Sequence, residues 1–331
     1  MSSRCSALRV LCCAALLYAA WLGGAAYGAD GYPTRPIRFV VPLPPGGAGD
    51  IVARTVAAKL SESWGQQVVI DNRGGANTII GAELVARAKP DGYTWLLGVQ
   101  GTLAINPVTY RRLPYNALRD FEPVTQLTRY GYVLIVPPAL PVRNVREFVA
   151  LAKRRPGEVS YGTSGAGGSN HLAGELFRLT TGVTMTAVPY KGSGPALTAL
   201  LSGEITSMFD TLITSIPLVK ANRVRALGVT LQQRSLSLPG VPTIAEAGVP
   251  GYHFDAWQSI VVPAGTPRAI VEKIHADAVK VLGLPEVRER LVDQGANELV
   301  GSSPEEFGKT IRAEIERYRK LIESARIVVQ E

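Results

Sequence analysis

Four glycine-rich stretches of this 331-residue chain have the composition of anion-binding turns, since each follows an apolar run that reads as a strand. Three of them also precede a predicted helix. Glycine lets the backbone approach a ligand and present its N–H groups, and a helix N-terminus adds partial positive charge. If such turns converge, they can hold a carboxylate without a buried arginine. The stretches are "PLPPGGAGD" (42–50), "GVQGTLAIN" (98–106), "YGTSGAGGSNH" (161–171) and "PYKGSGPAL" (189–197).

The first turn does not match the motifs that bind nucleotide phosphates. A P-loop ends in Gly-Lys-Ser or Gly-Lys-Thr, whereas "GGAGD" ends in Asp50, whose charge would repel a phosphate. The dinucleotide fingerprint fails too, because the third glycine is not at the required spacing. Lys191 in the fourth turn could serve an anion, but it precedes its glycines. Asp50 is instead predicted to be the N-cap of a helix that begins at Ile51.

The sequence also lacks a convincing catalytic constellation. Ser164 in "GTSGA" departs from the nucleophile-elbow pattern, because position 166 is alanine. The three histidines, His171, His253 and His275, have no partners at metal-ligand spacing. We therefore expect no enzyme, no metal and no cofactor, with a secreted α/β enzyme acting on a small carboxylic acid as the rival. His171 either lines a cleft or packs at a helix start.

Three other side chains have both a structural and a binding interpretation. Tyr190 follows a predicted strand and Trp257 lies in a Pro- and Gly-rich segment, so each can wall a cleft or fill a core. Asp210 ends the predicted strand "ITSMFD" and either caps the next helix or meets a ligand amine or water. The basic group "KRR" (153–155) ends a predicted helix, where cations complement the helix dipole. It therefore gives no reason to expect nucleic-acid binding.

The elements that must position these residues alternate between strand and helix from residue 37 onward. This alternation predicts an α/β fold in which parallel sheets have helices on both faces. The glycine-rich turns then lie at the carboxyl ends of strands, where such folds bind ligands. Extended segments around 121–142 and 236–266 indicate where the chain leaves one domain and later returns. We predict a first lobe of residues 30–127 plus 252–331 and an inserted second lobe, 128–251; two sequential domains are the alternative.

The first 29 residues have the pattern of a cleavable export signal. Arg4 and Arg9 form a basic start, "VLCCAALLYAAWLGG" is an apolar run too short to span a bilayer, and small residues follow it. The three cysteines of the chain all lie in this segment. The exported protein is therefore predicted to contain no disulfide.

Several stretches, in this order, resemble the periplasmic solute receptors of tripartite tricarboxylate transporters, also called Bug proteins. The resemblance covers essentially the whole exported chain, and the ordered set is far more specific than any one stretch. The matching stretches are "YPTRPIRFVVPLPPGGAGDIVAR", "VVIDNRGGANTIIGAELVARAKPDGYTWLLG", "AINP", "HLAGELF", "VPYKGSGPALTALLSGEI", "MFD", "RALGVT", "LPGVPTIAEAGVPGY" and "PAGTP".

The resemblance implies a type II periplasmic-binding-protein fold, with two lobes that each carry a mostly parallel sheet and close on a small carboxylated solute. It implies integral-membrane transporter subunits as partners; we expect a monomer. A ligand sensor that docks on a signalling receptor is a further alternative. The chain departs from the family pattern at Leu43-Pro44, Gly49 and Thr211, which leaves the identity of the solute open. The residues expected to bind it are Leu43, Pro45, Gly46, Gly47, Asp50, Gly101, Thr102, Ser164, Gly168, Ser169, Asn170, His171, Tyr190, Lys191 and Asp210.

Overall fold

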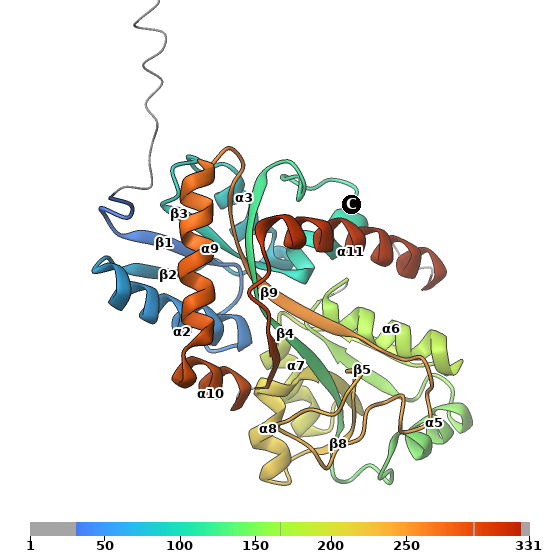
Figure 1. Cartoon of the computed structure of the whole chain (residues 1–331). Coiled ribbons are helices and arrows are strands. Elements are labelled where there is room, and N and C mark those ends of the chain that lie inside the picture. Colours follow the sequence, from blue (N-terminus) through green and yellow to red (C-terminus); the bar gives the residue numbers. More distant parts are fainter. Residues whose placement is uncertain (1–30, 166, 294, 326–331) are drawn as a thin grey trace, which may run out of the picture. The chain divides into compact units, whose positions relative to one another are not determined.

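A computed structural model describes residues 31–165, 167–293 and 295–325 (Figure 1). The predicted alternation of strand and helix begins at residue 37, and short helices follow the second and third strands. The elements of this first set are β1 (Ile37–Val41), α2 (Ala48–Trp64), β2 (Val68–Asn72), η1 (Ala76–Thr78), α3 (Ile79–Ala86), β3 (Thr94–Val99), η2 (Gly101–Ile105) and α4 (Asn106–Thr109).

The second set has the same alternation, and the C-terminal part is mostly helical, as predicted. The second set comprises β4 (Phe121–Val136), α5 (Val145–Arg154), β5 (Ser160–Thr163), α6 (Ser169–Thr181), β6 (Thr186–Pro189), α7 (Ser193–Ser202), β7 (Ser207–Thr211), α8 (Leu212–Lys220) and β8 (Arg225–Val229). The remaining elements are β9 (Asp255–Pro263), α9 (Arg268–Gly283), α10 (Pro285–Asp293), β10 (Ala296–Leu299) and α11 (Pro304–Ala325). Of these, β10 was not predicted from the sequence pattern, since it is a strand of only four residues.

The strands are ordered β2-β1-β3-β9-β4-β7-β5-β6, and β8 and β10 also pair with β4. The neighbours β2, β1 and β3 are parallel to one another, as are β7, β5 and β6. Strand β9 runs antiparallel to β3 and to β4, and β4 runs antiparallel to β7. The expected α/β fold is therefore present, with two parallel groups joined through long antiparallel strands.

Strand β4 belongs to both groups. We expected two extended runs joined at residues 129–131, but the 16-residue strand is continuous. Its first part, to Gly131, pairs with β9, and from Tyr132 it pairs with β7. A Cβ on Gly131 would lie 2.4 Å from Leu231 Cγ, so only glycine fits where the strand passes this side chain.

Aromatic and aliphatic side chains fill the interior on both sides of β4. The Trp95 indole packs edge-on against Phe39 and Trp64 beneath the first group of strands. In the second group, Phe177 contacts Phe148, Phe209 and Tyr252 at ring-centroid distances of 5.7 to 6.0 Å. Burial of such rings is the main source of stability for a chain whose cysteines all lie before residue 30.

Residues 33–331 form one compact unit. The expected export signal, residues 1–29, lies outside the described residues. Within the described part of the chain, no helix is long and apolar enough to cross a membrane.

Candidate functional site

The glycine-rich turns lie at the carboxyl ends of strands, as predicted. Residues 42–47 follow β1 and η2 begins two residues after β3, so both lie at the same edge of the first parallel group. Residues 164–168 follow β5, residues 190–192 follow β6, and α8 follows β7 directly, again at one edge. Each group of strands thus brings its own turns together.

Asp50 holds the first turn in shape. Its Oδ2 accepts hydrogen bonds from Gly46 N–H and Arg54 Nε, both at 2.9 Å, and its Oδ1 accepts one from Asn72 Nδ2 at 2.9 Å. Burial alone would raise the pKa of Asp50, but the hydrogen bonds from Arg54, Gly46 and Asn72 outweigh it and hold the pKa below its usual value. Helix α2 begins at Ala48 with Gly47 as its N-cap, so the prediction of Asp50 as the N-cap was wrong. The carboxylate instead ties the first helical turn back to the loop.

The backbone of the first turn is open to an incoming ligand at Gly47. Gly46 has a φ of +82°, which favours glycine, whereas Gly47 has a φ of −85°. A Cβ on Gly47 would meet only the Pro44 carbonyl, at 3.9 Å. Pro45 is exposed beside them, and Leu43 fills the space that a side chain at Gly49 would need. Gly46 and Gly47 are therefore well placed for backbone recognition, while Leu43 packs within the loop.

The third strand contributes an open glycine and a buried threonine. A Cβ on Gly101 would meet nothing within 4 Å. Thr102 is fully buried, and its Oγ1 donates to Thr78 Oγ1 at 2.7 Å, while its carbonyl accepts from the Tyr115 hydroxyl at 2.7 Å. The backbone of Gly101 can face a ligand, whereas the buried Thr102 side chain is held by its hydrogen bond to Thr78.

The turn after β5 is braced by Asn170. This buried side chain accepts hydrogen bonds at its Oδ1 from Ser164 N–H, at 3.2 Å, and from Ser164 Oγ, at 2.9 Å. Gly168 is the N-cap of α6 and donates its N–H to the Gly165 carbonyl at 3.2 Å, and half-buried Ser169 begins the helix. The polar side chains of this turn therefore hold one another in place.

His171 packs at the helix start. Its Nδ1 accepts a hydrogen bond from Gly167 N–H at 2.9 Å, and its ring stacks on Tyr161 with an interplanar angle of 19°. Burial lowers the pKa of His171, so the ring is neutral and carries its proton on Nε2. Of the two interpretations that the sequence left open, the geometry favours packing.

Tyr190 and Lys191 differ in how they are held. The Tyr190 hydroxyl donates to Glu204 Oε1 at 2.8 Å, which turns the ring toward the end of α7. The Lys191 side chain is exposed at the glycine-rich turn. Lys191 can therefore add positive charge near this edge of the sheet. The Tyr190 hydroxyl is instead used in its hydrogen bond to Glu204.

Asp210, at the carboxyl end of β7, is the most unusual of the candidates. Its Oδ2 accepts hydrogen bonds from Thr214 Oγ1 at 2.6 Å and from Ser215 Oγ at 2.8 Å, while its Oδ1 is buried with no hydrogen-bond partner. Burial raises the pKa of this carboxyl, although the hydroxyl groups oppose the rise. The side chain does brace the start of α8, and it also leaves one oxygen for a further donor.

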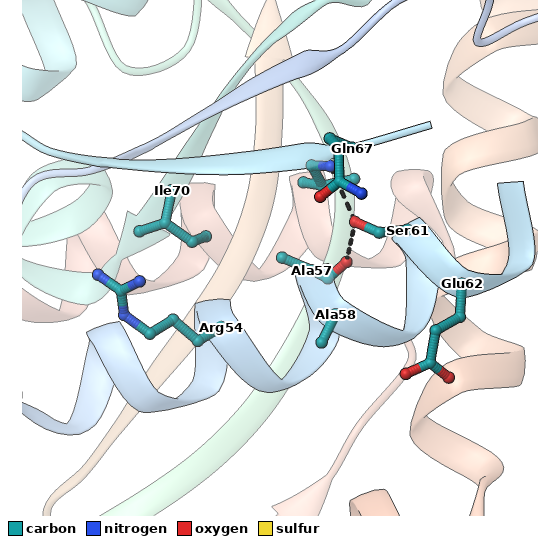
Figure 2. A pocket seen from close by; sticks show the side chains of 8 residues that line it. Arg54, Ala57, Ala58, Ser61, Glu62, Gln67 and Ile70 are labelled. Carbon is teal, nitrogen blue, oxygen red and sulfur yellow. Dashed lines mark hydrogen bonds between the residues drawn. The ribbon is translucent and has the colours of Figure 1, made fainter. Parts of the chain in front are cut away.

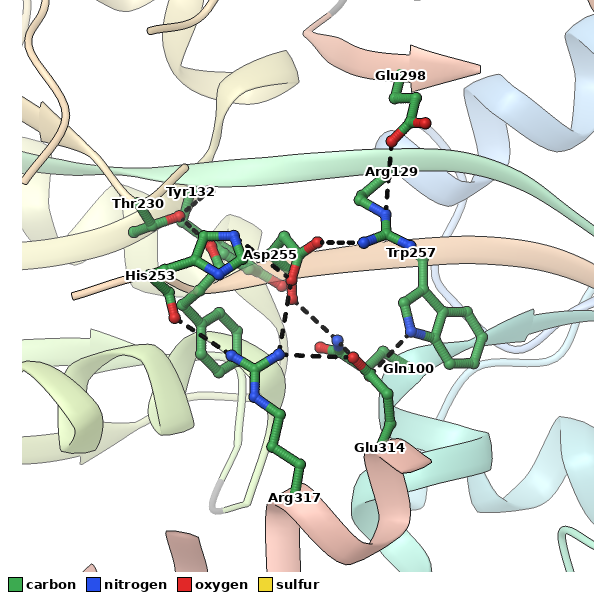
Figure 3. A network of polar contacts seen from close by, with 11 residues as sticks. Gln100, Arg129, Tyr132, Thr230, His253, Asp255, Trp257, Glu298, Glu314 and Arg317 are labelled. Carbon is green, nitrogen blue, oxygen red and sulfur yellow. Dashed lines mark hydrogen bonds and ion pairs between the residues drawn. The ribbon is translucent and has the colours of Figure 1, made fainter. Parts of the chain in front are cut away.

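A network of charged and polar side chains lies at the crossing of β4, β9 and α11 and includes Gln100, which precedes η2 (Figure 3). Gln100 Nε2 donates to the Asp255 carbonyl and to Glu314 Oε2, each at 2.9 Å, and Trp257 Nε1 donates to the same Glu314 oxygen at 3.0 Å. Burial raises the pKa of Glu314, and these two hydrogen bonds oppose the rise. The indole of Trp257 is thus a core and network residue rather than the wall of a cleft. The ion pairs of this network join Arg129 to Asp255 (3.1 Å) and Glu298 (3.7 Å), and Arg317 to Asp255 (3.8 Å) and Glu314 (3.6 Å).

A shallow groove between α2 and the edge strand β2 is a second place where a ligand could be sought (Figure 2). Its one cationic side chain, Arg54, is bound to Asp50 and donates to Asn72 Oδ1 at 3.1 Å. The Ser61 hydroxyl likewise has partners in the protein, because it donates a hydrogen bond to the Ala57 carbonyl and accepts one from Val68 N–H. The groove contains none of the predicted binding residues and offers no spare charge for a carboxylate.

The structure adds one element that the sequence did not single out, η1, at the turn after β2. Asn77 Oδ1 in η1 lies 3.7 Å from the place that a Cβ on Gly165 would take, and Thr109 in α4 lies 3.3 Å from that of Gly167. The turns of the two strand groups therefore meet at these points. The stretch "RGGANT" has the composition of a turn. The sequence does not show, however, which loop of the second group lies opposite this turn.

The fold and the arrangement of its strand-end turns define a solute-binding protein of the two-lobed periplasmic type. MatC of Rhodopseudomonas palustris, solved with bound malate, is 32% identical with a TM-score of 0.81, over 88% of this chain and all of its own. The R. palustris protein Rpa4515, solved with adipate, is 42% identical with a TM-score of 0.86, over 90% of this chain and 99% of its own.

Sequence comparison gives the family. Residues 52–327 match the model described as "Tripartite tricarboxylate transporter family receptor". The protein BugT of Bordetella pertussis is 35% identical over 295 residues, which are 89% of this chain and 90% of the relative. The chain belongs to the tripartite tricarboxylate transporter receptor family, as its sequence stretches indicated.

Proposed function

We propose that this receptor binds a small dicarboxylate between its two sets of strand-end turns and delivers it to membrane subunits of a tripartite transporter. The observation that carries the proposal is the meeting of the two sets, at Asn77 with Gly165 and at Thr109 with Gly167. A solute held there would contact backbone N–H groups from both sides. The adipate and malate bound to two of the related receptors support this ligand class.

The electrostatics of the turns favour recognition by backbone groups. Asp50, whose charge could oppose an anion, forms an ion pair with Arg54 and also accepts hydrogen bonds from Gly46 and Asn72. Gly47 and Gly101 leave space in front of their backbone, and Lys191 adds an exposed positive charge. Together these groups can attract a carboxylate and still release it, as transport requires.

The remaining parts of the proposal follow from the family. Export by cleavage of residues 1–29 would place the receptor in the periplasm. Of the binding residues named from the sequence, Gly46, Gly47, Gly101, Lys191 and Asp210 would line the interlobe site, and the others would hold its turns in shape. The lobes would be residues 30–127 plus 252–331 and residues 128–251, with closure by a hinge in β4 and β9. Binding energy would shift an open–closed population without chemical turnover.

The test is a thermal-shift screen of dicarboxylates, including adipate and malate, followed by chemical analysis of the recovered solute. A solute at 100 times its Kd is expected to add about 2.7 kcal/mol to the free energy of unfolding and to be recovered unchanged. Turnover of the solute would favour the enzyme alternative. No shift with any dicarboxylate would contradict the ligand class.

Replacing Gly47 tests where the solute binds. Gly47→Val should keep the fold, because the φ of −85° suits valine and no atom lies closer than 3.9 Å to the new Cβ. The branched side chain should block the approach of a carboxylate and lower affinity by at least about tenfold, or 1.4 kcal/mol. Gly240→Val, at another open glycine, is the control. Calorimetric titration that found equal affinities for both variants would remove the first turn from the site.

A further inference from the structure

Three successive residues of η1 have left-handed backbone conformations although none is glycine. Ala76, Asn77 and Thr78 have φ values of +44°, +54° and +76°. In the rest of the described chain, the only other residue of this kind is Asn222, with a φ of +54°. Left-handed geometry is unfavourable for side chains with a Cβ, and for a β-branched threonine it is rare. Such a run persists only where the surroundings enforce it.

Buried polar side chains from η2 and α4 enforce this conformation. Asn106 is fully buried and donates from Nδ2 to the Asn77 carbonyl at 2.8 Å. Thr102 Oγ1 donates to Thr78 Oγ1 at 2.7 Å, and the Tyr115 hydroxyl fixes the Thr102 carbonyl from behind. Turn η1 is therefore anchored to η2 and α4 by buried side chains.

The side chain of Asn77 faces the second lobe. Its Oδ1 lies 3.7 Å from the place that a Cβ on Gly165 would occupy. Gly165 and Gly167 have φ values of +138° and +77°, and neither has a side chain to keep the two lobes apart. The loop itself is stiffened by Asn170, which holds Ser164, and by the hydrogen bond between Gly168 and Gly165. The anchored Asn77 side chain thus lies close to Gly165, in a turn whose described residues hold one another in place.

We propose that Asn77 is a closure latch, a positioning residue that stabilises the closed arrangement of the lobes by its contact with the Gly165 loop. This inference rests on the proposed function, because it requires a receptor that opens and closes around a solute. A contact made only in the closed form shifts the open–closed population and raises the affinity for every solute by the same factor. A residue that contacts the solute would instead change the preference between solutes.

The latch accounts for the unfavourable backbone of η1. Glycine at position 77 would adopt a φ of +54° without cost, but it would have no side chain to reach the second lobe. The buried anchor of Asn106 and Thr102 keeps the turn in this conformation whether or not the lobes are closed. The side chain at position 77 is therefore presented in advance of closure.

Asn77→Gly tests the latch, and Asn222→Gly is a matched control. Both changes replace asparagine by glycine at a φ of +54°, but Asn222 is exposed just beyond the end of α8. Affinities for malate and adipate are measured by calorimetry for the wild type and both variants. Asn77→Gly should weaken both affinities by the same factor, about 3- to 10-fold, with the ratio between the two solutes unchanged. Asn222→Gly should leave both affinities as in the wild type.

The outcomes separate the latch from the proposed function. If the wild type binds neither solute, the dicarboxylate proposal fails, and the radius of gyration of the solute-free proteins then decides the latch. Asn77→Gly should give a larger radius in X-ray scattering than the wild type and Asn222→Gly, because its open form is more populated. Equal radii, unchanged affinities, or an affinity ratio that differs between malate and adipate would each overturn the latch.

Discussion

Two buried aspartates show how the surroundings of a single residue decide its role. Asp50, in the first turn of α2, and Asp210, near the carboxyl end of β7, are both nearly inaccessible to solvent. Both oxygens of Asp50 have donors, one of them a guanidinium, so its pKa is lowered. Asp210 has hydroxyl donors on one oxygen only, so burial dominates and its pKa is raised. Asp50 therefore stabilises its loop. Burial of the Asp210 oxygen costs free energy, which a hydrogen bond donated by a ligand would offset.

We predict that Asp210→Asn makes the protein more stable at neutral pH, by about 1 kcal/mol, and weakens binding of any solute that donates a hydrogen bond to this carboxylate. Because the folded pKa of Asp210 lies above its unfolded value, the native state binds more protons between the two values. The contribution of the Asp210 carboxyl to the free energy of unfolding is therefore fully present below the unfolded pKa. It is lost as the pH rises through the folded pKa.

Urea unfolding of the wild type and Asp210→Asn over a pH series checks this prediction. The difference in the free energy of unfolding between the two proteins should shrink toward acid pH. A difference that stays constant with pH would mean that the orphan oxygen has a donor in solution.

At the scale of elements, β4 and β9 join the two parallel groups of strands, and α11 is tied to their crossing through Glu314. This carboxylate accepts hydrogen bonds from Trp257 in β9 and from Gln100, which directly precedes η2. Asp255, at the start of β9, is paired with Arg129 of β4 and lies 3.9 Å from His253 Nε2. A predicted hinge strand, a binding turn and a helix are therefore joined by one carboxylate.

Replacing Glu314 with glutamine should make the free energy of unfolding less dependent on pH and should preserve the packing. Since burial raises the folded pKa of Glu314, the wild type should lose stability as the pH rises through that pKa. Glu314→Gln keeps an oxygen that can accept from Trp257 and Gln100, so its stability should be flatter between about pH 4 and pH 8. Glu298→Gln, at an exposed carboxylate of the same network, should keep the wild-type slope. Denaturant titrations followed by tryptophan fluorescence measure all three proteins, and equal slopes would contradict the prediction.

At the scale of the whole molecule, the alternating pattern and the turn residues were enough to predict the fold class and the edges where ligands can bind. Local pattern could not predict that β4 is one strand, because its continuity depends on pairing with β9 and β7, far along the chain. Nor could it assign His171 and Thr102 to packing, since their partners Tyr161 and Thr78 are brought to them by the fold. The expected binding residues themselves await the measurements proposed above.

Because β4 is shared by both groups of strands, we predict that residues 33–331 unfold in a single cooperative transition. Differential scanning calorimetry should give a calorimetric enthalpy equal to the van't Hoff enthalpy. Two resolved transitions would show instead that the lobes are stabilised independently and that the shared strand transmits little between them.

The position of β9 between β3 and β4 determines when the first sheet can form during synthesis of the chain. The first sheet cannot be completed until β9 has been synthesised, and β9 comes after the whole second set of strands. Pairing between such distant segments is intrinsically slow. A nascent chain would thus remain without its central strand for most of its synthesis, which is compatible with the proposed export of the chain before it folds.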